Sequence, residues 1–227
     1  MRLLMMMFTL FILCEADEWS LVKEKNGVTV HTREVNGSDF LEFRGETVVE
    51  ASVGTLVAIL YDTSNAPAWL HECSFGMTLE EAVFEENYIF QIYDLPFPVS
   101  DRQVILHSRL SWTQEGARLE TQEANTYCDN NQASRCKRVT ETDLIDIERS
   151  RGHYIFTPLS EKKTKVLWQQ HVEPGGSIPT WLVNLLVVDI PFNTLLQLQT
   201  LVKDEKYRDM TEVKLRDMWS KQYQTYH

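Results

Sequence analysis

The residues able to carry out acid–base, nucleophilic or metal chemistry are scattered along this chain. His71, Glu72 and Cys73 form the one dense trio of reactive types, but adjacent residues of a helix point in different directions. The sequence has no nucleophile elbow and no phosphate-binding loop. No two of the histidines stand at a metal-ligand spacing, and they are His31, His71, His107, His153, His171 and His227. We therefore predict no catalytic residue, no metal site and no cofactor, and expect that the protein is not an enzyme.

Two of the four cysteines could pair. Cys128 and Cys136 bracket the polar stretch DNNQASR, which lies between two segments with the pattern of strands. Antiparallel strands joined by such a loop can bring two Cα atoms within disulfide distance. In an oxidising compartment we therefore expect a Cys128–Cys136 bridge. Cys73 would then be a spare thiol, buried as a small apolar side chain.

Residues 1–16 are typical of a secretory signal peptide. Arg2 is followed by an apolar run from Leu3 to Leu13, and the small residue Ala16 suits a cleavage site. The run is shorter than the roughly 20 residues of a membrane-spanning helix. We expect cleavage near Ala16 and a periplasmic or secreted protein. An N-terminal anchor or a buried helix remains the alternative, and lipidation of Cys14 is weakly supported.

Composition limits the partners. The chain has 227 residues, of which 43% are hydrophobic and 24% charged, so it can fold around one core. Its net charge of −11 repels phosphate backbones, which argues against nucleic acid as a partner. No repeat or linker divides the chain. We expect a monomer with one domain over residues 17–227, comprising a core at about 19–204 and a C-terminal helical tail at 205–227.

Hydrophobic periodicity predicts an order of elements that ends in one long helix. A short helix is expected at 19–25, strands at 28–35 and 40–49, and helices at 52–61 and 68–73. Seven strands should follow, at residues 75–81, 88–95, 102–113, 118–128, 136–149, 153–159 and 164–172. A long amphipathic helix begins at Pro179. Consecutive strands joined by short turns imply an antiparallel sheet, whose concave face the long helix can cover.

Four stretches in succession resemble a known family. They are YDLPFPVSDR at 93–102, GHYIFTPL at 152–159, KVLWQQH at 165–171, and EPGGSIP with WLVN between 173 and 184. This succession is similar to START (StAR-related lipid transfer) domains, particularly bacterial ones. The resemblance implies an α+β helix-grip fold, in which a curved antiparallel sheet is wrapped around a long C-terminal helix with a hydrophobic tunnel. It also implies one bound lipid, fatty acid or sterol-like ligand, and transient membrane contact.

The sequence departs from the family in one respect. Members that bind sterol often place a charged pair inside the tunnel, on the strand that follows the PVSDR-type loop. Here that strand reads VILHS from Val104 to Ser108, so no inward arginine is expected on it. A sterol is therefore a poorer expectation than another lipid.

Side-chain alternation predicts which residues face the tunnel. Gln170 is the best candidate for a polar group that orients a ligand head group, because lipid pockets have mostly apolar walls. The expected ligand-binding residues are Tyr88, Phe90, Ile92, Val104, Leu106 and Ser108 from the strands at 88–95 and 102–113, Trp168 and Gln170 from the last strand, and Trp181, Leu185, Val188 and Phe192 from the long helix.

The sequence thus favours an exported protein that binds, and could transfer, a single hydrophobic ligand in an internal tunnel. Two alternatives stay open. Relatives with similar folds catalyse cyclisation or hydrolysis in the pocket, so a pocket enzyme of the same superfamily is one. The other is a module that binds a non-lipid partner through its surface, with the tunnel closed.

Overall fold

The computed structural model describes residues 18–129, 134–140 and 144–226, and the predicted signal peptide lies outside them. The strands are β1 (Ser20–Lys25), β2 (Val28–Arg33), β3 (Glu42–Val49), β4 (Cys73–Val83), β5 (Glu86–Tyr93), β6 (Arg102–Thr113), β7 (Gly116–Glu123), β8 (Ile145–Asp146), β9 (Arg149–Ser160) and β10 (Lys163–Glu173). The helices are α1 (Val53–Tyr61), α2 (Ser134–Thr140), α3 (Thr180–Leu201) and α4 (Glu212–Tyr226), with 3-10 turns η1 (Thr63–Ala68), η2 (Asn125–Asp129) and η3 (Glu205–Tyr207).

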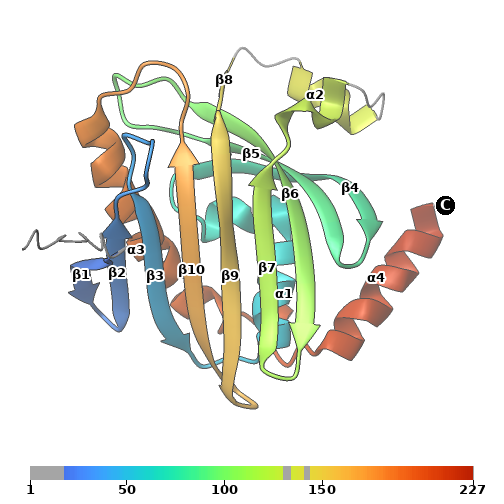
Figure 1. The fold of residues 1–227 in the computed structure, drawn as a ribbon. Helices are drawn as coiled ribbons and strands as arrows, with labels where there is room; N and C mark the ends of the chain where they lie inside the picture. The colour runs from blue at the N-terminus through green and yellow to red at the C-terminus, as the bar shows by residue number, and fades with distance from the viewer. Residues whose placement is uncertain (1–17, 130–133, 141–143, 227) are drawn as a thin grey trace, which may run out of the picture.

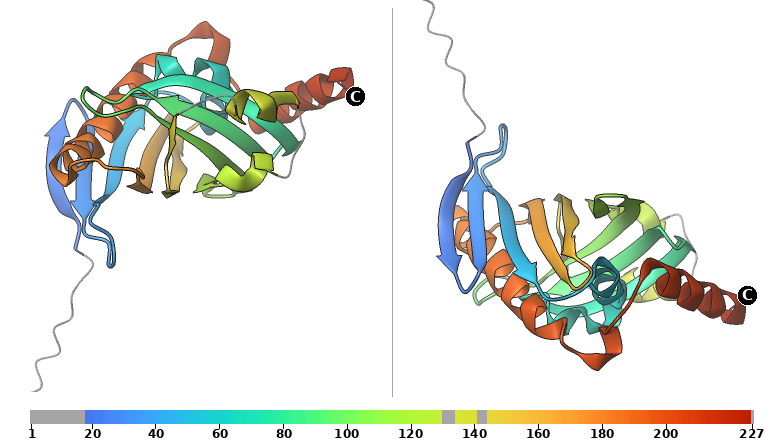
Figure 2. Two further views of the ribbon diagram at one scale, coloured as in Figure 1. Left: turned by 90° about the horizontal axis from the view of Figure 1, so that it is seen from above. Right: turned by 90° about the horizontal axis from the view of Figure 1, so that it is seen from below.

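The strands form one curved sheet. Their order is β1-β2-β3-β10-β9-β7-β6-β5-β4, every neighbouring pair in this order is antiparallel, and the short β8 pairs with β6 in parallel. The last strand of the sequence, β10, thus lies in the middle of the sheet, between β3 and β9 (Figure 1). Helices α1 and α3 lie together on one side of the sheet (Figure 2). The predicted curved antiparallel sheet with a long helix against it is confirmed.

The first element is a strand, so the helix predicted at 19–25 is wrong. Asn26 and Gly27 both adopt positive φ, 53° and 74°, which is the backbone of the tight turns that join hairpin strands. Lys25 and Val28 pair directly across this turn. The turn therefore requires extended chain on both sides, and this requirement overrides the helical pattern of a short segment.

The strand predicted at 136–149 is also wrong, although the structure contains the disulfide predicted there. Cys128 lies on η2 and Cys136 on α2, with 5.3 Å between their Cα atoms. We call these two elements the disulfide flap. Its buried residues Cys128, Cys136 and Val139 pack with Phe90 and Ile105. The outer face of the sheet is thus covered at this point.

Helix α3 approaches β3 closely because β3 carries a glycine at the contact. A Cβ atom on Gly45 would lie 2.7 Å from Leu195 Cδ1 and 3.4 Å from Pro191 Cβ. Any larger residue would push the helix away from the sheet. Leu195 and Leu198 are fully buried there. Among the described residues, α3 is the one helix long and apolar enough to cross a membrane, and 39% of its most apolar window is buried in the structure.

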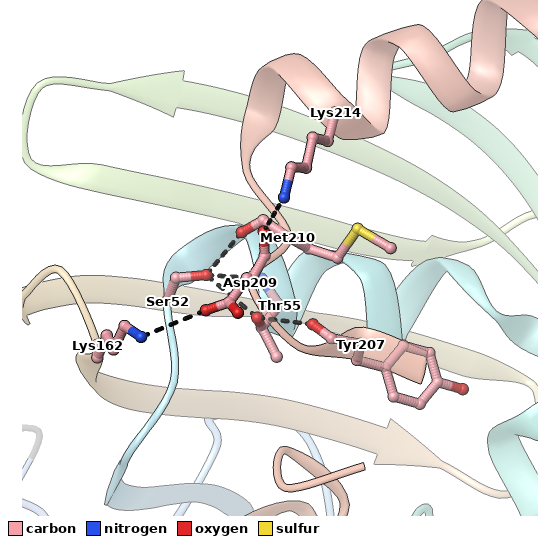
Figure 3. A network of polar contacts seen from close by, with 7 residues as sticks. All are labelled: Ser52, Thr55, Lys162, Tyr207, Asp209, Met210 and Lys214. Atoms are coloured by element: carbon pink, nitrogen blue, oxygen red, sulfur yellow. Dashed lines mark hydrogen bonds and ion pairs between the residues drawn. The ribbon is translucent and has the colours of Figure 1, made fainter. Parts of the chain in front are cut away.

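Polar contacts fix the chain that follows α3 to the start of α1 (Figure 3). Ser52 caps α1, since its Oγ accepts a hydrogen bond from Thr55 N at 3.1 Å and donates one to Met210 O at 2.7 Å. Thr55 Oγ1 donates to Tyr207 O at 2.9 Å. A side-chain cap of this kind contributes about 1 kcal/mol. The C-terminal end of α3 is therefore held against the body of the protein.

Thiol chemistry tests the disulfide. Cys73 is buried, and burial raises the pKa of its thiol to about 12. The thiolate is the reactive form, so Cys73 in the native protein should react slowly with iodoacetamide at pH 8. In denaturant without reductant, protein lacking residues 1–16 should show one reactive thiol, and reduction should reveal two more. Three reactive thiols before reduction would contradict the bridge.

Candidate ligand-binding cavity

A cavity of about 120 Å³ lies between the sheet and α3. Strands β6 and β10 form much of its floor, and the N-terminal half of α3 forms its roof. Ser150, Gln170 and Arg102 supply polar groups within otherwise apolar walls. The remaining lining residues are Phe43, Tyr93, Leu95, Val104, Leu106, Ile147, Trp168, Val172, Pro174, Ile178, Val183, Leu186, Val187 and Ile190.

The structure orients β6 and β10 as the alternation predicted, and the role of their residues in binding a ligand stays a prediction. Val104, Leu106, Trp168 and Gln170 all line the cavity. Ser108, the next inward residue of β6, is only 1% exposed, and its hydroxyl has no hydrogen-bond partner among the residues that the structure describes. It lies outside the lining of the cavity.

Tyr88, Phe90 and Ile92 face the other side of the sheet, so their predicted orientation is wrong. Phe90 pairs with Ile105, which points away from the cavity, and packs under the disulfide flap. Both faces of β5 are therefore covered, one by the core and one by the flap. Alternation of apolar and polar residues identifies the inner face of a strand only when its outer face is polar. The outer face of β5 is apolar. The residue of β5 that lines the cavity is Tyr93.

The face of α3 that lines the cavity is also not the predicted one. Trp181 and Leu185 are 69% and 51% exposed, Val188 is outside the lining, and Phe192 is buried with Lys23 Nζ over its ring. Because apolar residues occur all round this helix, the spacing of the sequence fits more than one stripe. The stripe that meets the cavity consists of Val183, Leu186, Val187 and Ile190.

Arg102 is the charged cavity-lining residue that the sequence reasoning missed. It is the first residue of β6 and is only 1% exposed. Its Nε donates to Pro174 O at 2.8 Å and its Nη2 to Gly175 O at 3.0 Å, while Nη1 donates to the carbonyls of Ser100 and Asp101. Arg102 precedes Val104 by two residues, so its side chain points to the same face of β6. This alternation could have revealed that Arg102 faces the cavity. The expectation of no inward arginine on this strand holds only from Val104 onward.

The charge of Arg102 is bonded to carbonyls alone. Among the described residues, no carboxylate forms an ion pair with it, and the nearby Asp101 carboxylate accepts a hydrogen bond from Leu95 N at 3.1 Å. Burial lowers the pKa of the Arg102 guanidinium, which nevertheless stays charged because arginine does not lose its proton in proteins. These four hydrogen bonds leave one Nη2 hydrogen without an acceptor among the described residues. A buried charge without a counter-ion is costly, so the site favours an anion beside Arg102.

A second polar group in the cavity is a chain of three side chains. Trp168 Nε1 donates to Gln170 Oε1 at 3.1 Å, and Gln170 Nε2 donates to Ser150 Oγ at 2.7 Å. These bonds fix the amide of Gln170. The Ser150 hydroxyl already accepts from Gln170, so its hydrogen can be donated to a ligand. The cavity therefore offers hydrogen-bond donors from both Arg102 and Ser150.

A larger hollow of about 720 Å³ lies elsewhere, between α1, β4 and α4. Its lining mixes aromatic residues such as Phe84 and Trp219 with the ion pair of Asp62 and Lys206. Those two charges neutralise each other. The central cavity differs because its one buried charge, that of Arg102, forms no ion pair with a described carboxylate. It is therefore the candidate site.

Comparison with known proteins places these features in a family. The sequence model of the START domain matches residues 4–197. An uncharacterized protein of Pseudomonas aeruginosa is 33% identical over 181 residues, covering 79% of this chain and 84% of that protein. Human phosphatidylcholine transfer protein is 23% identical over 169 residues, covering 74% of this chain and 75% of that protein.

Solved structures agree with this placement. A STAR-related lipid transfer protein from Xanthomonas axonopodis has a TM-score of 0.71 at 29% identity, with 82% of this chain and 99% of that chain covered. Human STARD10 has a TM-score of 0.69 at 15% identity, with 94% of this chain and 80% of that chain covered. At this identity, the likeness supports the fold alone. The family match, the curved sheet and the helix lying over an apolar cavity together show that this chain belongs to the START domain family.

Proposed function

We propose that this protein binds one lipid molecule in the central cavity, with an anionic group of the lipid beside Arg102. The observation that carries the proposal is the buried, carboxylate-free guanidinium in an otherwise apolar cavity. An anion at Arg102 would complete its hydrogen bonding, and Ser150 could donate to a second oxygen. The acyl chain would bind through burial, at about 0.8 kcal/mol per methylene.

The relatives support a lipid as the ligand. The human protein and the Xanthomonas protein are named for the transfer of phosphatidylcholine and of lipid, respectively. Phosphatidylcholine carries a phosphate oxygen of the kind that Arg102 would recognise. We propose a lipid with a phosphate or a carboxylate group, carried by a monomer.

A bound lipid requires a larger space than this cavity offers. Ligand pockets usually measure about 300–1,000 Å³, whereas this cavity measures about 120 Å³. The C-terminal end of α3 is fixed to α1, so the N-terminal end is the part that can lift. Gly175 and Gly176, at φ of 65° and 63°, precede that end and supply a permissive hinge.

We also propose that the protein is exported. The signal-like residues 1–16 motivate this proposal, and the Cys128–Cys136 disulfide supports it because such bonds persist in oxidising compartments. A protein that carries lipid outside the cytoplasm would meet its donor and acceptor membranes there.

Substituting Arg102→Met tests the anion preference. Oleate and oleyl alcohol share one chain and differ in charge, so the ratio of their affinities isolates the contact with Arg102. We expect the unsubstituted protein to prefer oleate by about tenfold, because a hydrogen bond between charged groups is worth roughly 1.5–3 kcal/mol. In R102M the preference should disappear. Displacement of a fluorescent fatty acid measures both ligands.

The ratio of the affinities for oleate and oleyl alcohol separates loss of the head-group contact from a general structural effect of the substitution. Loss of Arg102 leaves the carbonyls of Pro174 and Gly175 without this hydrogen-bond donor. That change can weaken the binding of both ligands to the same extent. Arg102→Lys retains a charge and should retain part of the preference for oleate. An unchanged ratio in R102M would contradict the proposed head-group site.

Exposed apolar side chains surround the lifting end of α3 and form a candidate membrane contact. Phe97 is 97% exposed on the β5–β6 loop, whose Leu95 lines the cavity. Trp181 and Leu185 are exposed on the first turns of α3. Aromatic residues favour the interface between lipid and water. We propose that this surface touches the membrane when lipid is exchanged.

Replacing Phe97 and Trp181 by Asp should slow lipid transfer between phosphatidylcholine vesicles. The expected loss is about tenfold, because burying one such side chain contributes roughly 1.5–3 kcal/mol. Lipid binding itself should be unchanged. Val213→Asp is the matched control, since Val213 is 77% exposed on α4, away from the cavity. Equal slowing in V213D, or none in the double variant, would refute the membrane contact.

A further inference from the structure

The outer face of the sheet carries a polar groove of about 620 Å³, away from the central cavity. Strands β3, β10, β9, β7 and β6 contribute to it, and the β2–β3 turn forms part of its rim. We call it the outer groove. Five arginines and three histidines line it, although the chain as a whole has a net charge of −11. They are Arg33, Arg109, Arg118, Arg149, Arg151, His107, His153 and His171.

Arg151 lies at the centre of the outer groove. It is exposed on β9, directly across from His171 on β10 and from Gln122 on β7. Residues paired in this way point to the same face, with Cβ atoms about 4.5–5.5 Å apart. His153 stands two residues further along β9 and therefore also faces outward. Arg151, His153 and His171 thus converge on one space.

The carboxylates nearest to this trio already have donors. Glu42 accepts from Arg33 Nε at 2.5 Å and from Gln169 Nε2 at 2.7 Å. Glu120 accepts from Arg118 Nε at 2.8 Å. The side chain of Arg151 forms no ion pair or hydrogen bond with the residues that the structure describes.

Glu173 is likewise occupied, since it forms an ion pair with Arg149 at 3.6 Å. Glu123 also lines the groove, and its Oε2 accepts a hydrogen bond from Ser150 N at 2.9 Å. The centre of the groove therefore holds Arg151 without an ion-pair partner among the described residues, beside the ring nitrogens of two histidines. His171 Nε2 lies 3.2 Å from Ser38 Oγ and 3.3 Å from Phe40 O, which holds the ring in place beside Arg151.

We infer that the outer groove is a second binding site, which takes the phosphate group of a small water-soluble molecule. Arg151 would bind two phosphate oxygens through its planar fork. His153 stands on a second side and can donate its ring N–H to another phosphate oxygen. His171 borders a third side, where Ser38 Oγ and Phe40 O hold its Nε2. The groove also has room for the polar body of such a molecule beside its phosphate.

The charge distribution favours a small molecule over an anionic membrane surface. An extended anionic surface would meet the net charge of −11 of the whole chain, as well as the glutamates around the groove. At 0.1 M salt, charges are screened over about 10 Å. A compact phosphate therefore interacts only with the charges that line the groove. The outer groove is therefore expected to act independently of the lipid cavity.

Inorganic phosphate is the probe for this site. We expect saturable changes in the backbone amide NMR signals of β9 and β10 when phosphate is added to the full chain, and none with chloride at the same ionic strength. Arg151→Gln should weaken phosphate binding about tenfold, the loss of roughly one charge-assisted contact. Its lipid affinity should not change.

Arg149→Gln is the matched control, because Arg149 lies on the same strand and face but already pairs with Glu173. It should change phosphate affinity less than about twofold, the effect of an exposed charge. Absence of saturable binding, or an equal loss in R149Q and R151Q, would overturn the site. Binding to phosphatidylglycerol vesicles that R151Q abolishes, without phosphate binding, would also overturn it and assign the face to a membrane.

Discussion

The close packing of α3 on β3 is the constraint on which the rest of this structure depends. Gly45 gives the helix room to approach, and Leu195 fills the contact. The polar contacts of Ser52 and Thr55 then hold the chain beyond α3 against α1. With its C-terminal half fixed in this way, the helix covers the cavity with its N-terminal half alone. That half is the part of the helix with exposed apolar side chains.

The second determinant is the cost of burying Arg102. Several kcal/mol are needed to remove an ion from water, and carbonyl groups offset only part of that cost. Two of these carbonyls belong to Pro174 and Gly175, at the junction between β10 and α3. An anion bound at Arg102 would therefore change the contacts of the β10–α3 junction. In the proposed opening, this junction is the point about which α3 turns. Ligand recognition and opening of the cavity are coupled through this one side chain in the proposed function.

Sequence reasoning succeeded where one local contrast decides the structure. On β10 the outward residues Gln169 and His171 are polar, so the inward orientation of Trp168 and Gln170 could be predicted. It failed on β5, whose outer face is the more apolar one because it lies under the disulfide flap, and on α3, where apolar residues occur all round. Arg102 was missed because a charged residue at the start of a strand is usually solvated. Its burial results from the tertiary approach of the β10–α3 junction.

The central claim is that this START domain carries a single lipid. The most direct test of this claim is native mass spectrometry of protein purified from its native host cells, followed by solvent extraction of the bound ligand. The account predicts a monomer that lacks residues 1–16, with a discrete excess mass of one lipid that extraction removes. A ligand-free mass that stays unchanged after incubation with mixed phospholipid vesicles would contradict it.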